Sequence, residues 1–306
     1  MTIEGVEGYD LGIIREGMGL VMEFIRGYMD CEEYRRLLSE LTGEIFGFSF
    51  ENWYNSGFFE GEYIPYSYVE NDKIIANASA NIMKFAYNGE EKFYIQIGTV
   101  MTRPEYRKQG LAKSLVEKIL AEYKTAADGF YLFANLNALE FYEKIGFKRQ
   151  DQWIYTVGGS KDGISLIEGF YPVGKEYRDT YVKMLKCAKL NAAFDHINRC
   201  SLQMFYTMEM DNVYYNSELN CFAVMHAEGD VLYLDSIISG NELDLMTMIQ
   251  NKGEYSKIVL GFTPKDKASL NAERYDGEDD YRFYYMGANL ECIEIDKLFL
   301  PIMSHA

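Results

Sequence analysis

The chain has 306 residues and a formal net charge of −17, with 48% hydrophobic and 15% aromatic residues. This composition supplies packed cores, excludes the disordered class, and at this length predicts two domains. Acidic residues outnumber basic ones in both halves, which disfavours nucleic acid and anionic membranes as partners. The surplus of negative charge suits a cationic small substrate and equally suits simple solubility.

The five cysteines are scattered and show no Cys-x-x-Cys spacing, which argues against a disulfide framework or a zinc site. We therefore expect a reducing, cytoplasmic location and no bound metal. The segment that begins Thr2-Ile3-Glu4 lacks a basic region followed by a long apolar run, so we expect neither a signal peptide nor a membrane span.

Period-two alternation marks the strands of the first half. From Ile74 to Met83, apolar residues share one side while Asn77, Ser79 and Asn81 share the other, which predicts a half-buried antiparallel strand. The first elements expected, in chain order, are a helix at 31–42 and strands at 63–69, 74–83 and 93–102.

An amphipathic helix follows the last of these strands. Apolar residues recur at helical spacing from Leu111 to Tyr123, which predicts a three-turn helix. A short strand at 130–134, a helix at 138–144 ended by Gly146, and a strand at 152–157 complete the first half.

The run from Gly158 to Gly163 predicts a flexible joint. Beyond it the order of elements partly repeats, with a helix at 177–190, strands at 221–226 and 231–238, a helix at 242–249 and a strand at 257–262. We expect two α+β domains in tandem, residues 1–157 and 164–306, each a mixed, mostly antiparallel sheet flanked by helices.

The stretch from Thr102 to Ala112 carries the chemistry. A strand ends there, a basic loop with a glycine follows, and a helix begins at once. Free amides and the positive end of the dipole make a helix start a phosphate site. Gly110 permits a close backbone approach, and Arg107 and Lys108 add positive charge. These features predict a pyrophosphate site without separating a nucleotide from coenzyme A.

Arg107-Lys108-Gln109-Gly110-Leu111-Ala112 matches a known signature: Arg or Gln, two residues, Gly, one residue, then Gly or Ala. On this motif the chain resembles the GNAT superfamily of N-acetyltransferases. A second family motif follows in Asn135, Ala138, Tyr142 and the run Glu143–Phe147, so the resemblance covers about residues 10–157.

The resemblance implies acetyl-coenzyme A as cosubstrate and a role for each matching residue. The pyrophosphate would be held by the loop and the first helical turn: Arg107, Lys108, Gln109, Gly110, Leu111, Ala112, Lys113 and Ser114. The main chain of Val100 and Thr102 would pair with the pantetheine arm, with the Val100 amide facing the thioester carbonyl. Tyr142 stands where the family places its general acid. Asn135 either supports the cofactor cleft or caps the following helix.

The sequence departs from the family at Gln96, where some relatives carry a glutamate base, so the general base is unassigned. The aromatic run from Trp53 to Tyr63 suits either an acceptor pocket or ordinary core. In the second half, the turn at 239–242 lacks a basic residue and carries Glu242, with Asp244 close behind. Both carboxylates would repel a pyrophosphate, which predicts a degenerate second domain that binds no coenzyme A.

The predicted reaction is direct transfer of acetyl from acetyl-coenzyme A to a primary amine, either a small cationic amine or a peptide amine. The alternative is a non-catalytic module that senses acyl-coenzyme A or contacts a protein. Transfer from aminoacyl-tRNA is disfavoured by the acidity of both halves. The oligomeric state cannot be read from the sequence.

Overall fold

The computed structural model describes residues 12–14, 22–159, 161–277 and 280–306. Residues 2–4, on which the expectation of no signal peptide rests, lie outside these ranges. The chain forms two compact units that interleave along the sequence. Unit 1 comprises residues 1–82, 95–130 and 306, and unit 2 comprises residues 83–94 and 131–305. The predicted domains, 1–157 and 164–306, are instead consecutive, and their boundaries stay a prediction.

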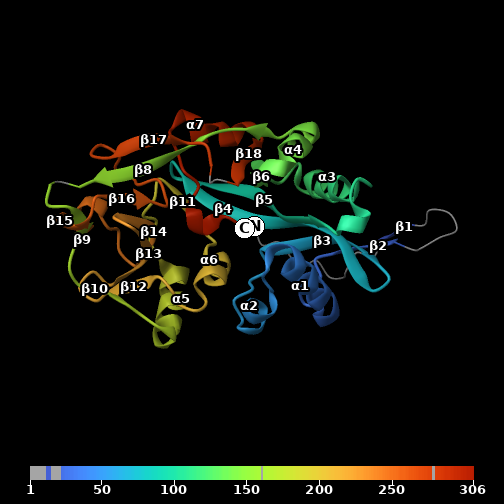
Figure 1. Cartoon of the computed structure of the whole chain (residues 1–306), viewed down its shortest axis with the longest axis horizontal. Coiled ribbons are helices and arrows are strands. Elements are labelled where there is room, and N and C mark those ends of the chain that lie inside the picture. The colour runs from blue at the N-terminus through green and yellow to red at the C-terminus, as the bar shows by residue number, and fades with distance from the viewer. Residues whose placement is uncertain (1–11, 15–21, 160, 278–279) are drawn as a thin grey trace. The chain divides into compact units, whose positions relative to one another are not determined.

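Unit 1 is built on an antiparallel sheet (Figure 1). Its order is β1 (Gly12–Ile14), β2 (Met22–Arg26), β3 (Tyr63–Glu70), β4 (Lys73–Tyr87) and β5 (Glu90–Thr102). The β3–β4 turn is tight because Asn71 and Asp72 adopt positive φ values of 49° and 57°. Both residue types tolerate this conformation, so the sequence specifies the hairpin locally.

Helices cover both faces of the unit 1 sheet. They are α1 (Glu32–Phe46), α2 (Glu51–Asn55), the 3-10 turn η1 (Pro104–Tyr106) and α3 (Leu111–Tyr123). Side chains alternate along β3, so Tyr66 and Tyr68 face α3, where Tyr68 meets Ser114. Tyr63, on the opposite face, packs against Phe50 at the start of α2. Figure 1 shows α3 and α1 on opposite sides of β3.

Unit 2 contains the end of the β4–β5 hairpin and strands from distant parts of the chain. β11 (Phe194–His196) pairs with the Phe85–Tyr87 end of β4. β6 (Gly129–Asn135), β18 (Tyr281–Met286) and β7 (Lys148–Arg149) adjoin in that order, and α4 (Leu139–Ile145) precedes β7. Buried aromatic side chains form the core here, among them Phe85, Tyr131, Phe194 and Phe283.

A second sheet in unit 2 has seven strands. Their order is β10 (Phe170–Pro172), β12 (Val213–Asn216), β13 (Cys221–Glu228), β14 (Val231–Ser239), β16 (Lys257–Leu260), β8 (Gln152–Gly158) and β17 (Asn271–Tyr275). β14 and β16 are parallel, and the other pairs of this sheet are antiparallel. Two further strands, β9 (Ile164–Leu166) and β15 (Ile249–Tyr255), pair with each other. The helices of unit 2 not yet named are α5 (Arg178–Cys187), α6 (Cys200–Thr207) and α7 (Cys292–Ile295). Its 3-10 turns are η2 (Leu136–Ala138), η3 (Lys175–Tyr177), η4 (Leu245–Met248), η5 (Ala288–Glu291) and η6 (Ile302–Ser304).

The predicted fold class, mixed and mostly antiparallel sheets flanked by helices, is confirmed. The helix predicted at 242–249 is wrong, since only the 3-10 turn η4 forms there. The Asp244 side chain accepts a hydrogen bond from the Met246 amide, and Ile249 already pairs with Leu166 of β9. The strand predicted at 152–157 exists as β8 but lies between β16 and β17. None of the helices described is long and apolar enough to cross a membrane.

Candidate functional site

The basic loop of unit 1 begins where β5 ends at Thr102. Arg103 is buried: its Nε donates to the Ile74 carbonyl at 2.8 Å, and its guanidinium pairs with Glu44. This arginine therefore anchors the loop to the sheet. The next cationic residues, Arg107 and Lys108, are exposed together with Gln109 and Gly110. The loop thus presents two positive side chains to solvent.

Gly110 stands at the turn from loop to helix. Its φ of +81° is a left-handed conformation that costs glycine little, and no heavy atom lies within 4 Å of an added Cβ. Lys108 also adopts a positive φ, 64°. The helical ladder starts with the Ser114 amide bonded to the Gly110 carbonyl, so the amides just before it are free of the ladder. The first turn carries no acidic residue, which leaves the helix dipole uncompensated.

Three of the side chains predicted to contact the pyrophosphate already have partners within the chain. Arg107 Nε donates to the Thr102 carbonyl at 3.2 Å. The Ser114 hydroxyl lies 2.8 Å from the Tyr68 hydroxyl, and Lys113 Nζ lies 3.7 Å from the Glu117 carboxylate. These contacts hold the side chains near the helix start and leave the main-chain amides as the principal anion donors.

The residue before Val100 has an unusual backbone conformation. Thr99 has a φ of +41°, which is an outlier for a β-branched residue. Asn77 Nδ2 donates to the Thr99 carbonyl at 2.9 Å, and the Thr99 hydroxyl bonds to the hydroxyls of Tyr63 and Ser79, each at 2.8 Å. This buried network holds Thr99 in its irregular backbone conformation directly before Val100. The alternation in the sequence placed Asn77 and Ser79 on the polar side of β4, but no sequence pattern predicted the strained backbone at Thr99.

Gln96 is buried at 1% exposure on the same strand. Its Nε2 donates to the main-chain oxygen of Ala306 at 2.7 Å, while its Oε1 has no partner among the described residues. A Cβ added at Gly98 would lie 3.1 Å from that Ala306 oxygen. The absence of a side chain at Gly98 thus admits residue 306 against β5. In this structure Gln96 binds another part of the chain and offers no titratable group.

Tyr142 and Asn135 belong to unit 2. Tyr142 is 7% exposed on α4, and its ring contacts Phe141 and Phe147 edge-on. Burial raises the pKa of Tyr142 well above the usual value, so the hydroxyl keeps its proton at neutral pH. Asn135 Oδ1 accepts from the Asn137 amide at 3.0 Å, which is the capping alternative predicted for it.

The aromatic residues after α1 are largely packed together. Trp53 and Tyr63 are buried, and Phe59 contacts both Trp53 and Tyr54. The Tyr54 ring is covered by the Arg35 guanidinium, 3.8 Å from the ring centroid. A cation–π partner is therefore already present at Tyr54, and the core interpretation accounts for this cluster.

The turn after β14, which corresponds in the second half to the basic loop after β5, has a different structure from that loop. β14 ends at Ser239, and a four-residue 3-10 turn replaces the helix that a phosphate site would need. Glu242 pairs with Lys265 at 3.3 Å, and the Asp244 side chain caps the turn. Within the described ranges, no group of three or more His, Cys, Asp or Glu residues is arranged to hold a metal ion.

Comparisons with known proteins agree with these features. Residues 26–147 match the model of the acetyltransferase (GNAT) family. A conserved protein of unknown function from Enterococcus faecalis V583, described as a probable N-acyltransferase, has a TM-score of 0.55 at 12% identity, over 88% of this chain and 73% of its own. A GCN5-related N-acetyltransferase from Kribbella flavida has a TM-score of 0.52 at 13% identity, over 89% and 72%. Eis1 from Mycobacterium abscessus has a TM-score of 0.53 at 10% identity, over 90% and 73%. No curated protein sequence matches significantly.

Proposed function

From the match of residues 26–147 to the model of the acetyltransferase (GNAT) family, we propose that the chain transfers acetyl from acetyl-coenzyme A directly to a primary amine. The observation that carries the proposal is the start of α3. It combines an open glycine at the N-cap, amides outside the helical ladder, no acidic residue in the first turn, and two exposed cations. Packing requires none of these features, whereas a pyrophosphate uses all of them.

These residues fit the cosubstrate, which would supply the acetyl group as a thioester. The main-chain amides from Gln109 to Lys113 and the Ser114 hydroxyl would hold its pyrophosphate, with Arg107 and Lys108 adding positive charge. Val100 and Thr102 would pair with the pantetheine arm through their main chain. The positive φ of Thr99 supports this assignment, because it departs from regular strand geometry directly before Val100.

The Val100 amide would act where charge develops. Attack of the amine on the thioester carbonyl produces a tetrahedral oxyanion, and a fixed N–H donor stabilises that charge without reorganisation. The network around Thr99 supports this role, because one hydrogen bond to its carbonyl and two to its hydroxyl hold the residue beside Val100 in place. We assign no general base, since Gln96 cannot take up a proton.

Tyr142 would protonate the departing thiolate. Its burial keeps the hydroxyl protonated, so the proton is present when the C–S bond breaks. The same burial opposes release of the proton, because a thiol has a pKa of about 8.5 and the pKa of Tyr142 lies well above it. Donation must therefore occur as the thiolate charge forms, with the hydroxyl hydrogen-bonded to sulfur.

The acceptor would be a small cationic amine or a peptide amine. The net charge of −17 favours an ammonium compound at the surface over an anionic acceptor. Two proteins of similar structure, described as an N-acetyltransferase and a probable N-acyltransferase, support nitrogen as the acceptor atom. We propose that residues 164–306 bind no coenzyme A, because the turn after β14 carries carboxylates and lacks an α-helix.

An amine panel assayed by release of free thiol from acetyl-coenzyme A tests the proposal. At least one polyamine, aminoglycoside, amino acid or N-terminal peptide should produce thiol in proportion to acetylated product. Tyr142→Phe should then lower kcat by about 10²-fold or more while acetyl-coenzyme A affinity stays within about twofold. Phe141→Leu is the matched control for packing on the same helix. Binding of acetyl-coenzyme A without turnover on any amine would favour the non-catalytic sensor.

A further inference from the structure

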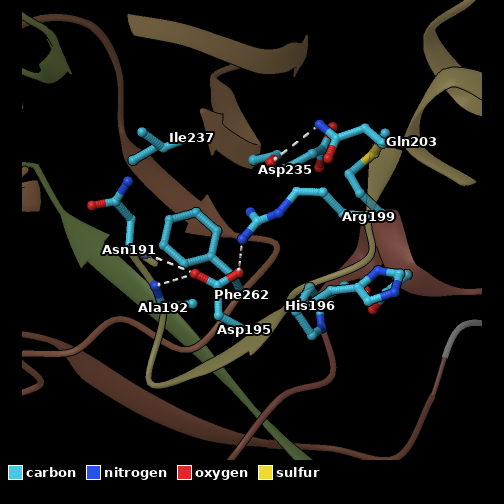
Figure 2. Close-up of a pocket in the computed structure, with 13 residues that line it drawn as sticks. Asn191, Ala192, Asp195, His196, Arg199, Gln203, Asp235, Ile237 and Phe262 are labelled. Atoms are coloured by element: carbon cyan, nitrogen blue, oxygen red, sulfur yellow. Dashed lines mark hydrogen bonds and ion pairs between the residues drawn. The ribbon is translucent and has the colours of Figure 1, made fainter. Parts of the chain in front are cut away.

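The pocket beside α6 in unit 2 is too small for an organic ligand. The Arg199 side chain extends along it to Asp195, and the two groups form a buried ion pair at 2.7 Å (Figure 2). Asp195 also accepts the amides of Asn191 and Ala192, at 2.7 and 3.0 Å. The charges of this pair are balanced within the chain, so the pair stabilises unit 2 and needs no charged ligand.

A cluster of three tyrosines lies at the edge of the seven-stranded sheet of unit 2. Tyr171 of β10 and Tyr215 of β12 are directly opposite each other in an antiparallel pair, so both side chains are on the same face. Tyr177 of η3 contacts both rings, with centroid distances of 6.3 Å to Tyr171 and 5.6 Å to Tyr215. The centroids of Tyr171 and Tyr215 are 6.0 Å apart. We call these three residues the tyrosine cluster.

The three rings are arranged as walls rather than as a stack. The Tyr171 ring makes interplanar angles of 78° with Tyr177 and 88° with Tyr215. Cation–π contacts extend to about 6 Å from a ring centroid. Because the centroids are 5.6 to 6.3 Å apart, a single cation over the cluster can lie within this limit of all three rings.

The cluster is held in place by contacts within the chain. The hydroxyls of Tyr171 and Tyr177 are 3.1 Å apart, and the Tyr215 hydroxyl donates to Asn220 Oδ1 at 2.8 Å. Phe222 of β13 is fully buried and supports the Tyr215 ring at a centroid distance of 4.6 Å. Rings that are already fixed lose little conformational entropy when a ligand binds, which favours binding of a small group.

Packing leaves the tyrosine cluster accessible. Tyr171 is 38% exposed, and the other two rings are half-buried. Elsewhere the chain places its own cations over aromatic rings, as Arg35 over Tyr54 and Lys297 over Trp153. Within the described ranges, no lysine or arginine lies over a ring of the tyrosine cluster. A cation from outside the chain can therefore take this place.

The chain around the cluster is acidic. Segments 168–179 and 209–220, which carry the three tyrosines, contain six acidic residues and two basic ones. One of the basic residues, Lys175, already pairs with Glu209. This local excess of negative charge attracts a cation and disfavours an anion.

The chemistry of the cluster selects the kind of cation. A primary ammonium is strongly hydrated and has N–H donors that need acceptors, whereas the three tyrosine hydroxyls already have partners. A quaternary ammonium has no N–H donors, and its methyl groups pack on aromatic faces. We propose that the tyrosine cluster binds a quaternary ammonium group, carried either by a small molecule such as choline or by a trimethylated lysine side chain.

Ligand-observed NMR titration of the full chain with choline tests this proposal. Choline should bind about tenfold or more tightly than 3,3-dimethylbutan-1-ol, its neutral isostere with carbon in place of nitrogen. Tyr171→Ala should weaken choline about tenfold, whereas Tyr171→Phe keeps the ring and should bind choline within about threefold of the wild type. Tyr281→Ala is the control, because Tyr281 is 40% exposed in unit 2 but lies outside the cluster. It should leave choline binding unchanged.

A peptide that contains trimethyllysine distinguishes the two sources of the group. Binding about tenfold tighter than choline would assign the group to a protein partner, and equal or weaker binding would assign it to a small molecule. Titration of Tyr171→Ala with acetyl-coenzyme A should give the affinity of the wild type, so this proposal and the transferase proposal can fail separately.

Three results would overturn the assignment to a quaternary ammonium. The first is that neither choline nor the trimethyllysine peptide binds to the folded wild type. The second is equal affinity for choline and its neutral isostere, which would show that the charge is not recognised. The third is normal choline binding by Tyr171→Ala.

Discussion

A single charge at Gly110 should separate cofactor binding from folding. Asp and Asn both tolerate the left-handed backbone at this position, and the space around an added Cβ is open, so Gly110→Asp and Gly110→Asn share the same backbone cost. They differ by one negative charge at the N-terminus of α3. That charge favours the helix dipole by about 0.3–1 kcal/mol, so Gly110→Asp should be at least as stable as Gly110→Asn.

The same charge would repel a bound pyrophosphate. Two unit charges about 5 Å apart interact by about 0.8 kcal/mol in water and about 3 kcal/mol at an effective dielectric constant of 20. Acetyl-coenzyme A should therefore bind Gly110→Asp about 4- to 200-fold more weakly than Gly110→Asn, and salt should reduce the difference. Calorimetric Kd values at low and high salt measure both effects. Equal affinities for the two variants would refute the placement of the pyrophosphate at this helix start.

Three further predictions concern buried groups. Asp195→Asn leaves the Arg199 charge buried and uncompensated and should lower the free energy of unfolding in urea by about 3–5 kcal/mol. Burial lowers the pKa of His196 to about 3 from 6.5, so the unfolded chain binds the proton first. Its stabilisation is full above about pH 6.5 and is lost toward pH 3, by about 1.4 kcal/mol per unit. Asn77→Ala removes the two hydrogen bonds that Asn77 Nδ2 donates to Thr99, and it should lower the free energy of unfolding in urea by about 1–3 kcal/mol. It should also lower kcat more than it lowers the affinity for acetyl-coenzyme A.

Each of these predictions has a matched control. Asp151→Asn breaks an exposed contact with Arg274 and should cost less than about 1 kcal/mol. His196→Asn should reduce the acid slope of the unfolding free energy without abolishing it, because burial also lowers the pKa of His305 to about 3. A slope equal to that of the wild type would contradict the assignment. Thr99→Gly relieves the positive φ but deletes the hydroxyl. A kcat unchanged in both Asn77→Ala and Thr99→Gly would show that the network has no role beside Val100.

The local signals of the sequence predicted most of the first half. The helix predicted from the apolar stripe at Leu111 and the strand predicted from the alternation at Ile74 both form, because each local pattern agrees with its tertiary surroundings. The loop between Arg107 and Gly110 could be placed because its glycine turn, its cations and the following helix are contiguous in sequence. The roles of Tyr142 and Val100 came only from the family resemblance and stay predictions.

The second half was harder to predict because its pairings are non-local. β18 lies beside β6, and β11 pairs with β4, so segments far apart in the chain complete a sheet. At Leu245, a cap by Asp244 and the pairing of Ile249 with β9 overrode an apolar pattern that favours a helix. The strained backbone at Thr99 is likewise imposed by side chains of neighbouring strands.

Calorimetric titration of the full chain with acetyl-coenzyme A is the most direct test of the central claim, that a single helix start in this protein binds the acetyl donor. The account predicts one equivalent per chain for the wild type and loss of binding in the Arg107→Glu, Gly110→Asp double variant, which should still fold and unfold cooperatively on heating. Two equivalents per chain would contradict a silent second half. No binding to the folded wild type would contradict the acetyltransferase itself.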